Sequence, residues 1–427
     1  MLTLAITLLM LGLLVIGAPV GFAMGIAGAV GLYTLGGTRF LYGILDTTPL
    51  STVGVYELVT IPMFLLMAEL VLLSGVTDDL FKAAAAWLGR IRGGLAMATS
   101  VAGAGFAAIC GSSTGSAATL AATTIPSMLA QGYDARLASG VVAISGTLAI
   151  LIPPSVGMIV YGFMAEVSIA KLFVAGVLPG LLVVSAIIVT VAILVRLDPD
   201  AAPATERVPL STRLRLLVGV LPTLLLFAFV TGAIYSGATT PTEASAVGAA
   251  GAFVLALACG NRRMPDFVQA FRRAALTSCM ILTIIVGAHI FGYFITITRL
   301  TQDIIAHVAA LEANRWVILI IILAGYVVLG MFMDQMAILV LTVPIVVPLV
   351  DSLGFDLIWF GVIFIIVAEL GLVTPPLGLN CFVVSRYADR PLWQVFRGTF
   401  PHVIAHFVVI AILLAFPAIT LWLPGRM

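Results

Sequence analysis

The peptides Ile152-Pro153-Pro154-Ser155 and Thr374-Pro375-Pro376-Leu377 interrupt two long apolar stretches, residues 137–164 and 357–385. Proline lacks the amide hydrogen that a helix needs, so a Pro-Pro pair leaves the carbonyls about four residues earlier without helical partners. Those carbonyls belong to Ala149 and Ile150 in the first stretch and to Gly371 and Leu372 in the second. Both stretches are therefore predicted to be helices that break part-way along their length.

A broken helix inside an apolar stretch offers two kinds of binding group. The freed carbonyl oxygens can coordinate a hard cation such as sodium, and the half-helix after the prolines points its positive end at an anion. Ser155, Thr374 and Asn380 can add hydroxyl oxygens or an amide donor. The alternative is a packing kink without ligands, but two breaks at matching positions favour a binding site.

The two breaks are related by an internal repeat. When the sequence is shifted against itself by 222 residues without gaps, helix-breaking residues align, including Gly132 with Gly354. The aligned prolines are Pro19 with Pro241, Pro126 with Pro348, Pro153 and Pro154 with Pro375 and Pro376, and Pro179 with Pro401. The two halves are therefore predicted to share a backbone path more than a set of side chains.

The composition places the chain in a membrane. Of its 427 residues, 62% are hydrophobic and only 9% are charged, whereas a soluble domain carries roughly 25% charged residues. The length allows about ten to twelve spans of roughly 20 residues each. A net charge of +1 argues against nucleic-acid binding, because no basic surface exists to neutralise phosphates.

The few charges also predict the topology. If Pro19 divides the first 35 residues into two short spans, fifteen of the twenty Lys and Arg residues fall on one face. The positive-inside rule identifies that face as cytoplasmic. The opposite face then holds both chain ends and the five other basic residues: Arg39, Lys171, Arg299, Arg315 and Arg426.

This topology makes the halves inverted copies of each other. The basic loop 261–273 corresponds to the sparsely charged segment 38–51, and the amphipathic segment 77–92 corresponds to 299–314. The members of each pair lie on opposite sides of the membrane. The predicted domains are a first repeat at 1–197, a cytoplasmic linker at 198–215 and a second repeat at 216–427. Inverted repeats with broken helices are typical of alternating-access transporters.

A re-entrant hairpin is predicted in each half. The glycine- and hydroxyl-rich peptide Cys110-Gly111-Ser112-Ser113-Thr114-Gly115-Ser116 separates two apolar runs that are too short to cross the membrane comfortably. A hairpin over about 94–130 fits this pattern, with its tip facing a cavity that satisfies the irregular backbone. The repeat places a second hairpin at about 316–350, with Met333-Asp334-Gln335 at its tip. The alternative is that the small residues of the first tip merely allow close helix packing.

The first tip also matches the hydrolase pattern G-x-S-x-G, with Ser113 in the position of the nucleophile. That pattern has its catalytic meaning on a strand-to-helix turn with a downstream acid and histidine. This sequence shows no strand pattern, and none of its four histidines lies close to the tip. A membrane serine hydrolase therefore remains a remote alternative, and the chain is not expected to be an enzyme.

Few acidic residues lie within the apolar stretches. Asp334 can bind a coupling cation or cap the returning half-helix, and the sequence does not decide between these roles. Glu69 and Glu369 can be paired within the bundle or line a water path. Glu243 lies in Thr240-Pro241-Thr242-Glu243, which has the form of a capping box.

Together, several motifs resemble the large membrane subunit of tripartite ATP-independent periplasmic (TRAP) transporters. They are Gly237-Ala238-Thr239-Thr240-Pro241-Thr242-Glu243-Ala244, the run 110–116 with Ile125-Pro126, the Ile152–Ser155 break, and Val373-Thr374-Pro375-Pro376-Leu377-Gly378-Leu379-Asn380. The resemblance implies a multi-pass protein of the bacterial inner membrane. It further implies sodium-driven uptake of an organic acid, such as a C4-dicarboxylate or sialic acid. It implies two protein partners, a periplasmic substrate-binding protein and a small four-helix membrane subunit.

In the resembled family, ion sites lie between each hairpin tip and the facing broken helix. The implied sodium ligands are Ser112, Ser113, Ala149, Ile150, Pro153, Met333, Asp334, Gly371, Leu372 and Thr374. The expected substrate contacts are Ser113, Thr114, Ser155, Thr374 and Asn380. The first tip carries hydroxyls and the second an acid and an amide, so ligands cannot be copied from one half to the other.

The sequence thus predicts an all-α polytopic membrane protein with a scaffold and an elevator-type transport domain. The transport domain would comprise both hairpins and both broken helices. A self-sufficient carrier of dicarboxylates or citrate, without a binding protein, remains the main alternative. No arginine can be assigned to the membrane midplane, so the group that binds a substrate carboxylate is not located by the sequence.

Overall fold

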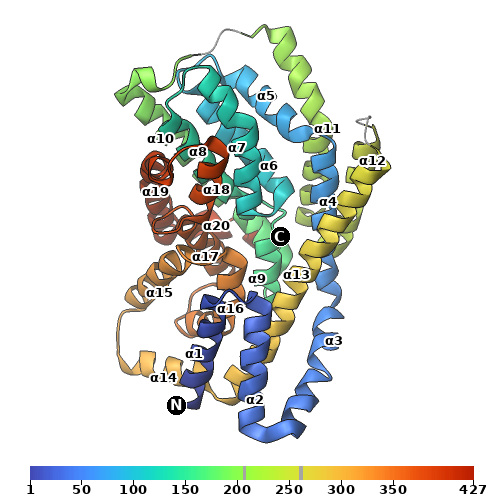
Figure 1. Cartoon of the computed structure of the whole chain (residues 1–427), viewed down its shortest axis with the longest axis vertical. Helices are drawn as coiled ribbons and strands as arrows, with labels where there is room; N and C mark the ends of the chain where they lie inside the picture. Colours follow the sequence, from blue (N-terminus) through green and yellow to red (C-terminus); the bar gives the residue numbers. More distant parts are fainter. Residues whose placement is uncertain (205–207, 259–262) are drawn as a thin grey trace.

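The computed structural model describes residues 1–204, 208–258 and 263–427, and these residues form helices without a strand (Figure 1). Residues 205–207 of the expected linker and 259–262, which overlap the expected basic loop, lie outside the described parts. Within those parts, eight helices are long and apolar enough to cross a membrane. The predicted all-α polytopic membrane fold is confirmed.

The first half contains ten α-helices. They are α1 (Leu2–Val15), α2 (Val20–Leu45), α3 (Thr48–Val53), α4 (Thr60–Leu73), α5 (Val76–Leu88), α6 (Gly94–Cys110), α7 (Ser113–Ala130), α8 (Ala135–Gly146), α9 (Val156–Met164) and α10 (Ile169–Leu197). Short 3-10 helices lie at Tyr56–Val59, at Thr147–Ile150 and, after α10, at Pro199–Ala201. Pro19 directly precedes α2 and follows the end of α1, so the chain is divided at the proline that the expected topology assumed.

The described part of the second half contains a further ten. They are α11 (Leu210–Tyr235), α12 (Pro241–Ala258), α13 (Met264–Ile297), α14 (Leu300–Ala310), α15 (Arg315–Gly330), α16 (Gln335–Ser352), α17 (Leu357–Gly371), α18 (Leu379–Ala388), α19 (Leu392–Ala415) and α20 (Ala418–Leu421). A final 3-10 turn lies at Pro424–Arg426. The expected capping box begins α12: the Thr240 amide donates to the Glu243 carboxylate, and the Glu243 amide donates to the Thr240 hydroxyl.

One group of helices packs around α13. Helix α2 lies along α13, and α4 packs between α13 and α12. The α2–α13 contact is close because glycines face it. A Cβ atom at Gly21 would lie 2.7 Å from the Thr283 carbonyl oxygen, and one at Gly28 would lie 2.7 Å from the Phe291 amide nitrogen. Two backbones this close form a stiff pair, since no flexible side chain separates them.

The second group contains the hairpins and the broken helices. Helices α6 and α7 form one hairpin, and α15 and α16 form the other. Helix α8 packs against α7 and α19, and α17 packs against α15. Glycines bring these backbones together as well: a Cβ at Gly330 of α15 would lie 2.6 Å from the Ala368 carbonyl oxygen of α17.

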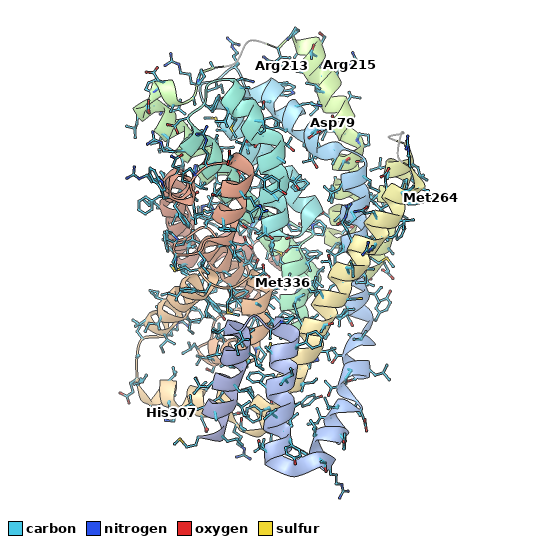
Figure 2. The ribbon with its side chains drawn as sticks, viewed as in Figure 1. Asp79, Arg213, Arg215, Met264, His307 and Met336 are labelled. Carbon is cyan, nitrogen blue, oxygen red and sulfur yellow. The ribbon has the colours of Figure 1, made fainter. Side chains whose placement is uncertain are left out.

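Equivalent elements of the two halves have matching bounds. Helix α7 and helix α16 begin and end 222 residues apart, and their N-caps are Ser112 and Asp334. The amphipathic helices α5 and α14 lie toward opposite ends of the molecule (Figure 1), with Arg213 and Arg215 at one end and His307 at the other (Figure 2). Inverted repeats require such an arrangement. The inversion and the domain limits themselves stay predictions.

Candidate functional site

A cavity of about 890 Å³ lies where the two helix groups meet. The first hairpin contributes Gly111, Ser112, Ser113, Thr114, Gly115 and Thr119, and the second contributes Asp334, Met336 and Ala337. The facing wall consists of residues from the start of α2, from α4 and from α13, including Glu69 and Thr277. Met336 lies near the centre of the molecule in Figure 2. Both predicted tips therefore face the same space.

The first tip is a tight turn between α6 and α7. Gly111 ends α6 with a φ of 59°, a conformation that glycine adopts without strain. Ser112 then caps α7, and its hydroxyl accepts from the Gly115 amide at 3.4 Å. Thr114 lies 3.5 Å from the Ser112 hydroxyl. The sequence expectation that hydroxyls gather at this tip and face a cavity agrees with this geometry.

Ser113 connects the first tip to the second half of the chain. Its hydroxyl donates to the Glu369 carboxylate of α17 and lies 3.4 Å from the Gly146 carbonyl oxygen of α8. Glu369 is 2% exposed, and its other carboxylate oxygen has no hydrogen-bond partner among the residues described. The sequence did not identify this contact, because a separation of 256 residues carries no local pattern.

The second tip has a different chemistry. Asp334 caps α16 by accepting from the Met336 amide at 3.0 Å, and it also lines the cavity. Both of the roles left open for Asp334 therefore remain compatible with its position. Gln335 is fully buried, and neither atom of its amide group has a partner in the described parts of the chain. Its nitrogen lies close to Gly157 of α9, so this tip also reaches the opposite half.

The first helix break lies beside the first tip. The 3-10 turn Thr147–Ile150 follows α8, and Pro153 and Pro154 separate it from α9. Ala149 and Pro153 are buried, whereas Ile150 reaches the cavity wall. Ser155 caps α9 by accepting from the Met158 amide, and its hydroxyl donates to the Ile150 carbonyl. Ser155 therefore closes the break and does not line the cavity.

The second break is closed by different groups. Thr374 donates its hydroxyl to the Leu370 carbonyl at 2.7 Å, and its amide donates to the Gly371 carbonyl at 3.0 Å. The Leu372 carbonyl accepts from the Asn380 amide at 3.1 Å. The Asn380 side chain is fully buried, with no partner for its amide group among the described residues. Neither Thr374 nor Asn380 is part of the cavity wall, although the sequence proposed both as substrate contacts.

The charges around the cavity are unbalanced. Glu69 and Asp334 line it, and the wall residues that the structure describes include no Lys, Arg or His. Glu69 accepts a hydrogen bond from the Arg273 guanidinium of α13 at 2.8 Å. Glu69 is therefore paired within the bundle, which was one of the two alternatives the sequence left open. The sequence did not indicate its partner.

A family model described as the DctM component of the tripartite ATP-independent periplasmic transporter matches residues 7–419. The chain belongs to this family. It is 37% identical over 371 residues to the C4-dicarboxylate TRAP transporter large permease protein DctM of Pseudomonas aeruginosa. That alignment covers 87% of this chain and 86% of the relative.

A second relative is named for a different substrate. It is the sialic acid TRAP transporter large permease protein SiaM of Vibrio cholerae, 31% identical over 97% of this chain and 96% of the relative. Among solved structures, the YdaH transporter of Alcanivorax borkumensis aligns with a TM-score of 0.64 at 16% identity. That alignment covers 91% of this chain and 89% of the other, and it shows a shared fold.

Family membership confirms the resemblance drawn from the sequence motifs. The chain is a multi-pass permease of the bacterial inner membrane and not an enzyme. The G-x-S-x-G match at the first tip is therefore not a hydrolase motif. Its central residue, Ser113, is instead a buried link between the two halves.

Proposed function

We propose that this chain carries out sodium-coupled uptake of an organic acid across the inner membrane. The observation that carries this proposal is the shared cavity. Ser112 and Thr114 from one half and Asp334 from the other line the same space, against a wall formed by the packed helices α2, α4 and α13. A solute in this cavity touches both helix groups, so movement of one group against the other transfers it across the membrane.

Sodium is the proposed coupling ion because the tips and breaks are rich in oxygen. Pro153 and Pro375 cannot donate to the carbonyls of Ala149 and Gly371, four residues earlier. Hard cations prefer such carbonyl, hydroxyl and carboxylate oxygens. The first proposed site joins Ser112 and Ser113 to Ala149, Ile150 and Pro153, and the second joins Met333 and Asp334 to Gly371, Leu372 and Thr374. Here sodium is a transported ion.

A carboxylate is the proposed substrate class. One relative is named for a C4-dicarboxylate and another for sialic acid, which are both carboxylates. The first tip presents the start of α7 to the cavity, and the amino end of a helix favours an anion. Ser113 and Thr114 belong to that helix start and line the cavity, whereas Ser155, Thr374 and Asn380 support the backbone behind it.

The proposed mechanism is an elevator. Sodium first orders the two tips, and the substrate carboxylate then docks between them. The hairpins and broken helices slide as one group against the α2, α4, α13 scaffold and release the substrate into the cytoplasm. The glycine-mediated backbone contacts within each group favour movement of the groups as rigid units.

Two protein partners complete the proposal. A periplasmic binding protein delivers the substrate, and a small four-helix membrane subunit braces the scaffold. Large apolar side chains such as Leu225, Phe229 and Val254 are exposed on α11 and α12, which leaves a surface for lipid or a membrane partner.

Uptake by proteoliposomes tests the proposal. The chain, the small subunit and the binding protein are reconstituted, and entry of labelled succinate or sialic acid is followed with and without an inward sodium gradient. Uptake is expected only with the gradient. Equal uptake without sodium contradicts the coupling, and uptake by the purified chain alone favours the self-sufficient carrier.

A further inference from the structure

The charged side chains in the described part of the cavity wall are all acidic. Its wall carries the acidic residues Glu69 and Asp334 and, among the described wall residues, no basic side chain. Glu69 is already paired with Arg273, whereas Asp334 repels a carboxylate that enters this space unless a cation balances the charge. Sodium at the tips supplies positive charge on one side only. The opposite wall, formed by the scaffold, needs a group that attracts the substrate.

Arg273 is the basic residue placed to supply that charge. It lies on α13 directly before Ala274 and one helical turn before Thr277, which both line the cavity. Its guanidinium reaches the Glu69 carboxylate, part of the same wall. Arg273 therefore lies at the rim of the cavity, on the scaffold side.

The pairing with Glu69 uses only one edge of the guanidinium. The bond joins Nε of Arg273 to Oε2 of Glu69 at 2.8 Å. The two terminal nitrogens, Nη1 and Nη2, make no hydrogen bond to any residue that the structure describes. The Arg273 side chain is 47% exposed, so these donors are accessible. Two parallel N–H groups of this kind match the two oxygens of a carboxylate.

We propose that Arg273 binds a substrate carboxylate at the scaffold rim of the cavity and that Glu69 holds its guanidinium in the orientation for doing so. This inference rests on the proposed function, because it concerns the same cavity and a carboxylate substrate. Arg273 is a substrate-binding residue, and Glu69 is a positioning residue. Glu69 occupies the Nε edge, so the Nη edge is free for the ligand.

The position of Arg273 also fits the direction of transport. It lies in the basic segment that the charge distribution assigns to the cytoplasmic side, nine residues after the first residue of α13. A carboxylate that leaves the tips toward the cytoplasm meets Arg273 on its way out. A weak, exposed ion pair with Glu69 allows this exchange, because such pairs contribute little stability of their own.

Arg272 is a matched control for Arg273. It is the preceding residue on the same helix, carries the same charge and is exposed, but unlike Arg273 it pairs with no acid of the cavity wall among the described residues. If the basic residues of this segment serve only to contact anionic lipid headgroups, both arginines behave alike. A substrate-binding role predicts that they differ.

The first experiment does not depend on transport. The purified full-length chain is treated with the arginine reagent phenylglyoxal, and modification of Arg273 and Arg272 is followed by mass spectrometry. Succinate and sialic acid are tested separately. At least one of them is expected to slow modification of Arg273 several-fold and to leave Arg272 unchanged. Equal modification rates with and without both acids overturn the proposal.

The second experiment measures uptake kinetics in the reconstituted assembly with its partners. R273Q is expected to raise the KM for the transported acid about tenfold or more, the usual effect of losing a charge-assisted hydrogen bond. R273K keeps the positive charge but loses the two parallel N–H groups of the guanidinium. A several-fold increase in KM is therefore expected from this variant, provided that it folds normally. R272Q and R272K are expected to match the wild type. Equal effects at both positions overturn the proposal.

Glu69 provides the positioning test. Gln in place of Glu69 keeps an oxygen that accepts from Nε of Arg273, so E69Q is expected to keep a KM close to that of the wild type. E69A removes the acceptor and is expected to raise the KM with little change in maximal rate. If the wild-type assembly takes up no carboxylate, the proposed function fails, while the protection experiment still decides whether Arg273 binds one.

Discussion

Ser113, at the tip of the first hairpin, donates a hydrogen bond to the carboxylate of Glu369, near the end of α17 in the other half of the chain. The two residues are 256 positions apart and are both 2% exposed. Loss of either partner leaves a buried polar group unpaired, which costs more than the hydrogen bond itself contributes. This contact links the tip of the first hairpin to the broken helix of the other half.

Replacement of Ser113 by alanine is expected to lower the free energy of unfolding by about 1–3 kcal/mol and to reduce sodium-dependent uptake strongly. The stability loss follows from the unpaired Glu369 carboxylate, and the uptake loss follows from the missing tip hydroxyl. Unfolding in detergent and uptake by proteoliposomes measure the two effects. The double variant S113A/E369Q is expected to be less destabilised than the sum of the single variants, because the two groups interact.

Ser116 is the control for Ser113. It lies one turn further along α7 and is fully buried, but its hydroxyl has no partner among the residues described. S116A removes a polar group without breaking a hydrogen bond, so its stability is expected to equal or exceed that of the wild type. If S116A loses as much stability as S113A, the cause is the change in side-chain shape. The explanation from the lost hydrogen bond then fails.

Close backbone contact between α15 and α17 gives a second prediction. A Cβ at Gly330 would lie 2.6 Å from the Ala368 carbonyl oxygen and 2.8 Å from the Cα of Gly371. Neither neighbour is a flexible side chain, so G330A is expected to cost about 1–3 kcal/mol of stability by forcing the helices apart.

The comparison is Gly325 on the same helix, where a Cβ would meet no atom within 4 Å. G325A is expected to be neutral or slightly stabilising, because alanine favours a helix more than glycine does. Thermal unfolding of both variants in detergent measures the difference. Equal stability of the two variants contradicts the packing argument.

A third prediction concerns pH at the turn between α7 and α8. The hydrogen bond from Arg136 holds the pKa of Asp134 below its ordinary value of 3.8. A lowered pKa in the folded state means that this pair stabilises the fold above the unfolded pKa and loses that effect as pH falls through the folded value. Arg136 is 53% exposed, so the effect is expected to stay below about 1 kcal/mol.

The variant D134N tests this pH dependence. Asparagine keeps an oxygen that caps α8 but has no charge, so the stability difference from the wild type is expected to be full at pH 7 and to shrink as the pH falls below 3.8. Unfolding curves for both proteins across this range provide the measurement. If the stability difference between D134N and the wild type is unchanged at pH 3, the ion pair between Asp134 and Arg136 is not its cause.

The sequence was most informative where one residue type determines the backbone. The Pro-Pro breaks and the capping box at Thr240 follow from local chemistry, so they could be predicted without a structure, and a cap at Asp334 was one of the two roles that the sequence left open. The internal repeat then extended the prediction from one half to the other.

Contacts between the halves could not be found in this way. At the repeat offset Glu369 corresponds to Thr147 and Arg273 corresponds to Ser51, so neither charged residue has a counterpart that would draw attention to it. Their partners, Ser113 and Glu69, are selected by how α17 packs on the first tip and how α13 packs on α4. The sequence also assigned Ser155 to the substrate, whereas its hydroxyl bonds to the Ile150 carbonyl within the break.

The last prediction separates the two roles of Asp334. Its carboxylate caps α16 and lines the cavity, so replacement by alanine would remove both functions together. Asparagine is as good an N-cap as aspartate but is neutral. D334N is therefore expected to keep the thermal stability of the wild type. Because sodium binds a carboxylate more strongly than an amide, the same variant is expected to raise the sodium concentration for half-maximal uptake about tenfold or more.

Asp356 is the matched control, because it caps α17 by accepting from the amide two residues later, as Asp334 does in α16, and is not part of the cavity wall. D356N is expected to leave both stability and the sodium dependence of uptake unchanged. If D334N behaves like D356N, Asp334 acts only as a helix cap. The proposed second sodium site would then be reduced to Met333, Gly371, Leu372 and Thr374. A sodium dependence shifted in D334N alone establishes that the cavity-facing carboxylate contributes to the ion site.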